Sequence, residues 1–143
     1  MKNILMLSFV IILGANAGNF SRDDTKEIVT DGDTCLQWQD NADAKTVRKT
    51  WSEAIEYCEN LSLGGYDDWR LPNINELRSI VDYTRFNPAM NPTFQNVVSS
   101  AYWSSTTDAS GSSNAWYVSF YDGHDVWRGK SVSVYVRCVR AGQ

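Results

Sequence analysis

Histidine and clustered cysteine are scarce in this sequence. Its 143 residues include one His and three Cys, and no two cysteines form a Cys-X-X-Cys pair. This excludes a His-rich metal site and a zinc site built from cysteine pairs. Basic residues are not in excess either, because 13 Lys and Arg stand against 17 Asp and Glu, which leaves a net charge of -4. That balance argues against nucleic-acid binding and against a polybasic membrane binder.

A long apolar run occurs only at the start of the chain, in residues 4–13. The run is shorter than the ~20 residues that span a bilayer as a helix, and Ala15-Asn16-Ala17 matches the small-X-small pattern of a cleavage site. We therefore expect residues 1–17 to be a secretory signal peptide, with an N-terminal membrane anchor as the alternative. The protein would then be secreted, periplasmic or on the cell surface, with no membrane insertion after cleavage.

The rest of the chain has the length and composition of one globular domain. Apolar residues make up 43% of the sequence and charged residues 21%, which is typical of a folded protein rather than a disordered one. Residues 18–26 are mostly polar, and we expect them to be a flexible lead-in. Residues 27–141 are expected to form the domain.

Several segments have the composition or the alternation of β-strands. The β-rich segments 27–30 and 34–38 flank a turn at Gly32, which predicts a hairpin. Residues 116–121 and 132–138 alternate, so that one face of each is mainly apolar. In the first of these, Trp116, Val118 and Phe120 would face the core.

Two helices are predicted between these strands. The first covers residues 50–61, because Thr50 and Glu53 form a capping box and apolar residues follow at helical spacing. The second begins after Asn73, which can act as its cap, with Glu76 three residues later. The order of elements predicts an α+β fold with two helices packed on antiparallel strands.

The three cysteines leave one unpaired. Cys58 lies on the apolar stripe of the first predicted helix, and Cys138 lies on the apolar face of the last predicted strand. Both would point into the core, so we expect a helix-to-last-strand disulfide in an oxidising compartment; two buried free thiols are the alternative. Cys35 would then be a buried free thiol or form an intermolecular link.

Four motifs resemble the Lcl C-terminal domain family. In chain order they are VTD with LQWQD near residues 29–40, DWRLPNINEL at 68–77, YWSS at 102–105 and YVRCVR at 135–140. The resemblance covers about residues 27–140 and implies a C-type lectin-like fold, in which a Cys on the first helix bonds a Cys on the last strand. It extends distantly to the formylglycine-generating enzyme group, which shares that fold. A relative in this family is a trimeric adhesin domain that binds sulfated glycosaminoglycans, so the resemblance also implies a homotrimer.

The motif residues are interpreted mainly as structural. We expect Trp69 and Trp103 to fill the core, and Arg70 to pair with a carboxylate such as Glu76. Arginines beside a strand are more often structural than ligand-binding, so we expect Arg137 to have a structural role. These motifs therefore predict how the domain is held together rather than what it binds.

The most ligand-like residues gather around a tight turn at Gly123. Aromatic rings can stack on the apolar faces of sugars, and planar polar groups can bond paired hydroxyls. The candidate ligand-binding residues are Tyr117, Tyr121, Asp122, His124, Asp125, Trp127 and Arg128. The alternative is a solvent-exposed loop between strands. Ca²⁺ bound by Asp122 and Asp125 is a second alternative, but the Glu-Pro-Asn and Trp-Asn-Asp patterns of calcium-dependent lectins are missing, so we expect no metal or cofactor.

Three functional classes follow. The first is an exported, non-enzymatic binding module that recognises a surface glycan or protein, as an adhesin does. The second is a structural or assembly subunit of the cell envelope. The third is an enzyme of the formylglycine-generating type; that group works through a Cys pair, however, and only Cys35 remains here, so we expect no catalytic residues. Residues 114–131 also have the composition of retroelement-diversified segments in some lectin-like domains.

Overall fold

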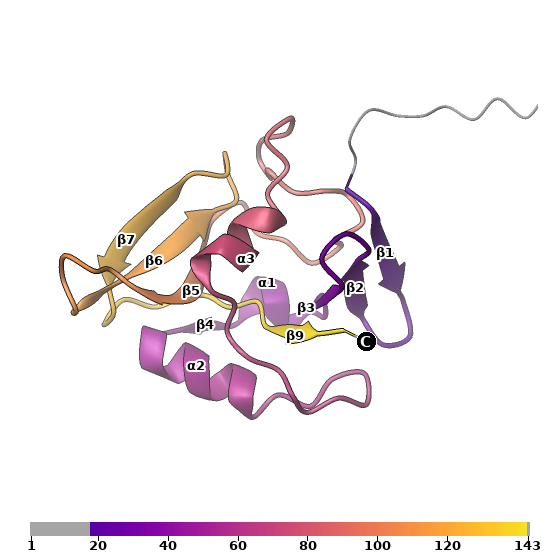
Figure 1. Cartoon of the computed structure of the whole chain (residues 1–143), viewed down its shortest axis with the longest axis horizontal. Coiled ribbons are helices and arrows are strands. Elements are labelled where there is room, and N and C mark those ends of the chain that lie inside the picture. The colour runs from indigo at the N-terminus through magenta and orange to yellow at the C-terminus, as the bar shows by residue number, and fades with distance from the viewer. Residues whose placement is uncertain (1–17, 143) are drawn as a thin grey trace, which may run out of the picture.

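The computed structural model describes residues 18–142, and the predicted signal peptide at residues 1–17 lies outside them (Figure 1). The described part is an α+β domain with three helices and two sheets, which confirms the predicted class. The helices are α1 (Asp43–Thr46), α2 (Trp51–Glu59) and α3 (Ile74–Ser79). The strands are β1 (Phe20–Asp23), β2 (Ile28–Asp31), β3 (Leu36–Gln39), β4 (Arg48–Lys49), β5 (Ala101–Thr107), β6 (Asn114–Ser119), β7 (Asp125–Gly129), β8 (Val134–Tyr135) and β9 (Val139–Ala141).

The first sheet joins the beginning and the end of the domain. Its strand order is β1-β2-β3-β9, and all its pairs are antiparallel. The predicted hairpin is confirmed as β2 and β3. The expected flexible lead-in is not observed, because Phe20–Asp23 pairs with β2 along its whole length. The Phe20 ring packs edge-on against Phe94 at 5.4 Å between centroids, and this contact gives the polar segment an apolar anchor.

The second sheet has the order β4-β8-β5-β6-β7 and lies at the other end of the view in Figure 1. Its strands are antiparallel except for β5 and β8, which run parallel where Tyr102 faces Tyr135. The continuous strand predicted for residues 132–138 is wrong: β8 is two residues long, and the chain then passes to β9 in the first sheet. The alternation fails because Arg137, expected on the outer face, is as fully buried as Val136 and Cys138.

The two predicted helices are present, and their starts match the caps in the sequence. The Glu53 carboxylate accepts the Thr50 N–H at the start of α2. At the start of α3, the Asn73 side chain accepts the Glu76 N–H and the Glu76 carboxylate accepts the Asn73 N–H. The short helix α1 was not predicted, because four residues carry too little periodicity to stand out.

The disulfide between Cys58 and Cys138 is confirmed, with 5.5 Å between the two Cα atoms. It joins α2 to the residue just before β9 rather than to a residue within the last strand. Closing a loop of 80 residues stabilises the folded state by ~4 kcal/mol on the chain-entropy model. A structural disulfide is compatible with an extracytoplasmic compartment. Cys35 is a free and exposed thiol, so the expectation that it is buried is wrong.

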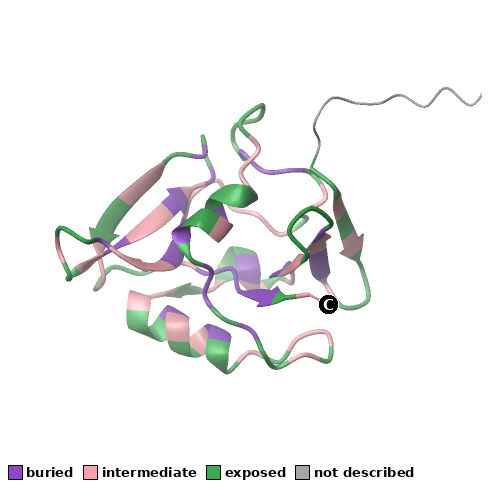
Figure 2. Cartoon of the chain, in the orientation of Figure 1, coloured by how far each residue is buried: buried purple, intermediate pink, exposed green. Residues whose placement is uncertain are grey.

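The core is divided into two clusters of buried side chains. One lies between the first sheet, α3 and strands β5 and β6, and includes Trp38 and Leu77. The other surrounds the disulfide and includes Trp69 and Trp103. Figure 2 shows that burial is concentrated where the sheets and helices meet, while much of the segment after α3 is exposed. Within residues 18–142, none of the helices has the length and apolar character needed to cross a bilayer.

Candidate functional site

Two motif residues form a buried ion pair in the core. The side chains of Asp40, at the end of the LQWQD motif, and Arg137, in the YVRCVR motif, are both fully buried, and their charged atoms lie 3.1 Å apart. Arg22 from β1 donates its Nε–H to the same carboxylate at 2.7 Å. We call Arg22, Asp40 and Arg137 the ionic centre. It joins β1, the end of β3 and the approach to β9.

The ionic centre also holds the segment that leads into β5. The two Asp40 carboxylate oxygens accept the backbone N–H groups of Gln95 and Asn96 at 2.9 and 3.1 Å. The Arg137 guanidinium donates to the Asn96 carbonyl as well. Buried charges of this kind are costly to separate from their partners. The charged motif residues are therefore committed to positioning a loop.

The other motif residues also have internal partners. Arg70 donates two hydrogen bonds to the Glu76 carboxylate, at 2.6 and 2.7 Å. This pairing, together with the Asn73 backbone N–H, holds the pKa of Glu76 below its usual value. Trp69 and Trp103 are buried, and their indole N–H groups donate to the carbonyls of Tyr66 and Lys49. The structure thus gives each of these residues a packing or pairing role.

The predicted ligand-binding residues do not form one surface, because the β6–β7 hairpin divides them between its two faces. Trp116 lies opposite Trp127, which puts both rings on one face of the sheet. Tyr117 and Arg128 belong to the other face, where the guanidinium lies 5.7 Å from the centre of the Tyr117 ring. Tyr117 also packs against the core cluster around the disulfide. Asp125 pairs with Arg78 at the end of α3.

The remaining three predicted residues lie at the turn of this hairpin. Tyr121 is 50% exposed, and the His124 ring contacts the Asp122 carboxylate. This contact holds the pKa of Asp122 below its usual value. Gly123 between them has a φ of +89°, and a side chain there would collide with Val81. Only glycine fits this turn without strain, because the backbone is left-handed and the space is filled.

Sequence reasoning missed two aromatic residues that lie beside this turn. Tyr83 and Phe86 are 70% and 74% exposed, and both belong to the loop after α3. The Phe86 ring lies 6.5 Å from Tyr121 at an interplanar angle of 65°. The Asn87 N–H donates to the Tyr121 carbonyl at 2.7 Å, which binds the loop to the hairpin. Two aromatic residues in a segment without helix or strand periodicity, close to a proline, are the signal that could have identified them.

We call Tyr83, Phe86, Tyr121, Asp122 and His124 the turn surface. Three large rings and an acid–base pair are exposed together here, although they come from two segments almost 40 residues apart. Exposed aromatic groups of this kind mark interaction sites more often than packing positions. Among residues 18–142, no three His, Cys, Asp or Glu side chains are grouped so that they could hold a metal ion.

The molecule is thus a small disulfide-linked α+β domain, in which buried motif residues support an exposed aromatic surface. It belongs to the Lcl C-terminal domain family, whose sequence profile matches residues 27–140. This match confirms the resemblance read from the four motifs and spans the same residues. A comparison with curated proteins found no match.

Proposed function

We propose that this protein is a non-enzymatic binding module that recognises a surface glycan or a surface protein through the turn surface. The observation that carries the proposal is the exposure of Tyr83, Phe86 and Tyr121 at one turn, next to the Asp122–His124 pair. Large rings left in contact with water are costly unless a partner covers them. A glycan is the favoured partner, because rings stack on sugar faces while carboxylate and imidazole groups bond hydroxyls.

The turn surface is held to the rest of the domain by hydrogen bonds and an ion pair, and this rigidity supports a binding role. The loop after α3 is tied to the hairpin by backbone hydrogen bonds from Asn87 to Tyr121 and from Ala89 to Phe120, both 2.7 Å long. Asp125 at the start of β7 pairs with Arg78, which links the other side of the hairpin to α3. A surface held in its bound shape loses little conformational freedom when the partner arrives.

We also infer a C-type lectin-like fold and export from the cell. The link from the first long helix to the residue before the last strand supports the fold assignment. The pairing of β3 with β9, which brings both ends of the domain into one sheet, also agrees with it. The apolar start of the sequence and the disulfide support export.

The test is a screen of the purified protein against immobilised glycans and a panel of cell-surface proteins. The double variant Phe86→Ala with Tyr121→Ala should reduce binding at least ~10-fold, since a stacked ring contributes ~1–3 kcal/mol. Val132→Ala is the matched control, because Val132 is an exposed apolar residue outside the turn surface. Binding that survives in the double variant would contradict the assigned surface. A screen without any ligand would instead favour a structural subunit of the cell envelope.

A further inference from the structure

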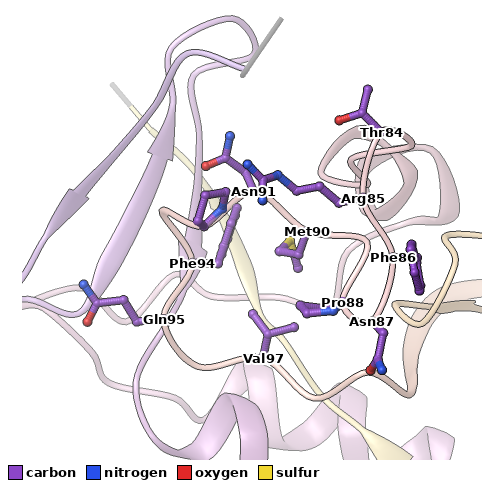
Figure 3. A pocket seen from close by; sticks show the side chains of 11 residues that line it. Thr84, Arg85, Phe86, Asn87, Pro88, Met90, Asn91, Phe94, Gln95 and Val97 are labelled. Atoms are coloured by element: carbon purple, nitrogen blue, oxygen red, sulfur yellow. The ribbon is translucent and has the colours of Figure 1, made fainter. Parts of the chain in front are cut away.

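A cavity of about 520 Å³ is lined by the loop between α3 and β5. This volume lies within the range of ~300–1,000 Å³ that is usual for small-molecule sites. Phe86, part of the turn surface, is also part of the cavity wall. In Figure 3, Met90 lies between Phe94 and Phe86, with Pro88 and Val97 below it, so the floor of the cavity is apolar.

One charged residue, Arg85, lines this cavity, and no carboxylate does. Its Nε lies 3.3 Å from an oxygen of Asp82, whose other oxygen is bonded by Thr84. Among residues 18–142, Asp82 is the ion-pair partner of the Arg85 guanidinium and approaches it from the Nε side, so a ligand would bind at the edge formed by the two terminal nitrogens. In Figure 3 this side chain extends toward Asn91 at the upper edge of the cavity. A planar guanidinium can bond a carboxylate at this edge through two parallel hydrogen bonds.

Hydrogen bonds hold the walls of the cavity in place. The N–H groups of Gln95 and Asn96 are bonded to Asp40 of the ionic centre. Asn91 is buried, its side chain accepts the Thr93 N–H, and its carbonyl accepts the Phe94 N–H. On the opposite side the Asp82 N–H donates to the Ala89 carbonyl at 3.0 Å. The cavity is therefore preformed, and a ligand would not have to order the loop.

We propose that this cavity is a subsite for an N-acylated sugar that carries one carboxylate. The carboxylate bonds the terminal nitrogens of the Arg85 guanidinium, and the acyl methyl group enters the apolar floor at Met90 and Phe94. The sugar ring lies toward Phe86 and continues onto the turn surface, so this inference rests on the proposed function. A single cation suits one carboxylate; a polyanion would meet the net negative charge of the chain. A sugar with hydroxyls alone would leave the apolar floor uncovered.

The test uses the purified protein and the methyl α-glycoside of N-acetylneuraminic acid as the probe. Titration followed by protein-observed NMR should shift the backbone amide signals of residues 84–97. Methyl glucuronide carries the carboxylate without the acyl group, and methyl N-acetylglucosaminide carries the acyl group without the carboxylate. Each should bind at least ~10-fold more weakly than the complete probe, because each loses one of the two contacts. Equal binding of all three sugars would overturn the proposal.

Two variants separate the contributions of charge and cavity. Arg85→Gln should weaken the complete probe ~10–100-fold and leave the affinity for methyl N-acetylglucosaminide unchanged. Arg85→Lys should have an intermediate affinity, because lysine keeps the positive charge but cannot donate the two parallel hydrogen bonds of a guanidinium. Val97→Phe fills the cavity and should weaken both acylated sugars. Arg48→Gln is the control for charge, since Arg48 is exposed and does not line the cavity.

The results distinguish this inference from the proposed function. A glycan that needs Phe86 and Tyr121 but binds Arg85→Gln as tightly as the unaltered protein would overturn the subsite and leave the binding module in place. Shifts confined to residues 120–128 would have the same meaning. Binding of the probe that depends on Arg85 and survives Tyr121→Ala, at a turn-surface residue that does not line the cavity, would support the subsite while contradicting the turn surface. No shift at any probe concentration would overturn the subsite.

Discussion

The ionic centre and the turn surface use the same kinds of residue in opposite ways. In the ionic centre, Asp40 and Arg137 have no exposed side-chain area and bond to each other and to backbone groups. In the turn surface, Asp122 and His124 are about half exposed and contact each other beside three open rings. One region is closed to solvent and the other faces it.

This difference shows why the motif residues and the proposed binding residues need not coincide. A buried charge is tolerated only when its partners surround it, so the motif arginines and Asp40 are committed to the fold. An exposed ring gains little from the fold, and its position makes sense when a partner covers it. The two regions are nevertheless connected, because the ionic centre holds the loop that lines the cavity next to the turn surface.

The largest effect is expected from disrupting the ionic centre, the buried region of the two. Asp40→Asn should lower the free energy of unfolding by ~3–5 kcal/mol, because it leaves Arg137 buried without its counter-ion. Asp24→Asn is a matched control, since Asp24 pairs with the same Arg22 but its side chain is 79% exposed, and it should cost less than ~1 kcal/mol. Urea unfolding of both variants measures the difference. Equal losses would show that burial does not distinguish the two pairs.

The second prediction concerns the disulfide beside the ionic centre. Cys138→Ser should cost ~2–5 kcal/mol of stability, whereas Cys35→Ser, at an exposed free thiol, should stay within ~0.5 kcal/mol. Denaturant unfolding under non-reducing conditions gives both values. Non-reducing peptide mapping should recover Cys58 joined to Cys138 and Cys35 alone. A peptide that joins Cys35 to Cys58 would contradict the pairing.

The third prediction tests how far the exposed region extends along the hairpin. Trp127 is 51% exposed on β7, so Trp127→Ala should change stability by no more than ~0.5 kcal/mol. If the binding surface continues from the turn along this face, the variant should bind the screened ligand ~5–150-fold more weakly. Thermal melting and a binding titration are the two measurements. Unchanged affinity would limit the binding surface to the turn itself.

The smallest effect is expected at the Arg70–Glu76 pair, whose exposure to solvent is intermediate between that of the ionic centre and that of the turn surface. Because Arg70 holds the pKa of Glu76 below its usual value, the pair stabilises the fold above the ordinary carboxyl pKa. That stabilisation is lost as the pH falls through the lowered pKa. The Arg70 side chain is 45% exposed, so screening by solvent should limit the effect to ~0.5 kcal/mol.

Glu76→Gln tests this pH dependence, because glutamine can keep the capping box while it removes the charge. The unaltered protein should be slightly more stable than the variant at neutral pH, and the two should converge in acid. Urea midpoints measured across the acidic range give the comparison. A difference that stays constant with pH would show that the charge on Glu76 contributes nothing.

Much of the fold could be predicted because its signals are local. The caps at Thr50 and Asn73 mark the starts of α2 and α3, and the Gly32 turn marks the β2–β3 hairpin. The inward positions of Cys58 and Cys138 predicted their disulfide. Side chains a few residues apart determine caps, turns and apolar faces, so a short window of the sequence is enough to identify these features.

The tertiary structure alone decided what depends on contacts between distant segments. The polar stretch at Phe20–Asp23 becomes a strand because it pairs with the edge of β2 and because Arg22 donates a hydrogen bond to Asp40. The last predicted strand is divided because Arg137 must turn inward to that same carboxylate. Phe86 meets Tyr121, and Tyr83 comes close to Gly123, only once the loop after α3 is bonded to the hairpin. The sequence determined which side chains are available, and long-range packing determined which are buried with partners and which remain exposed to solvent.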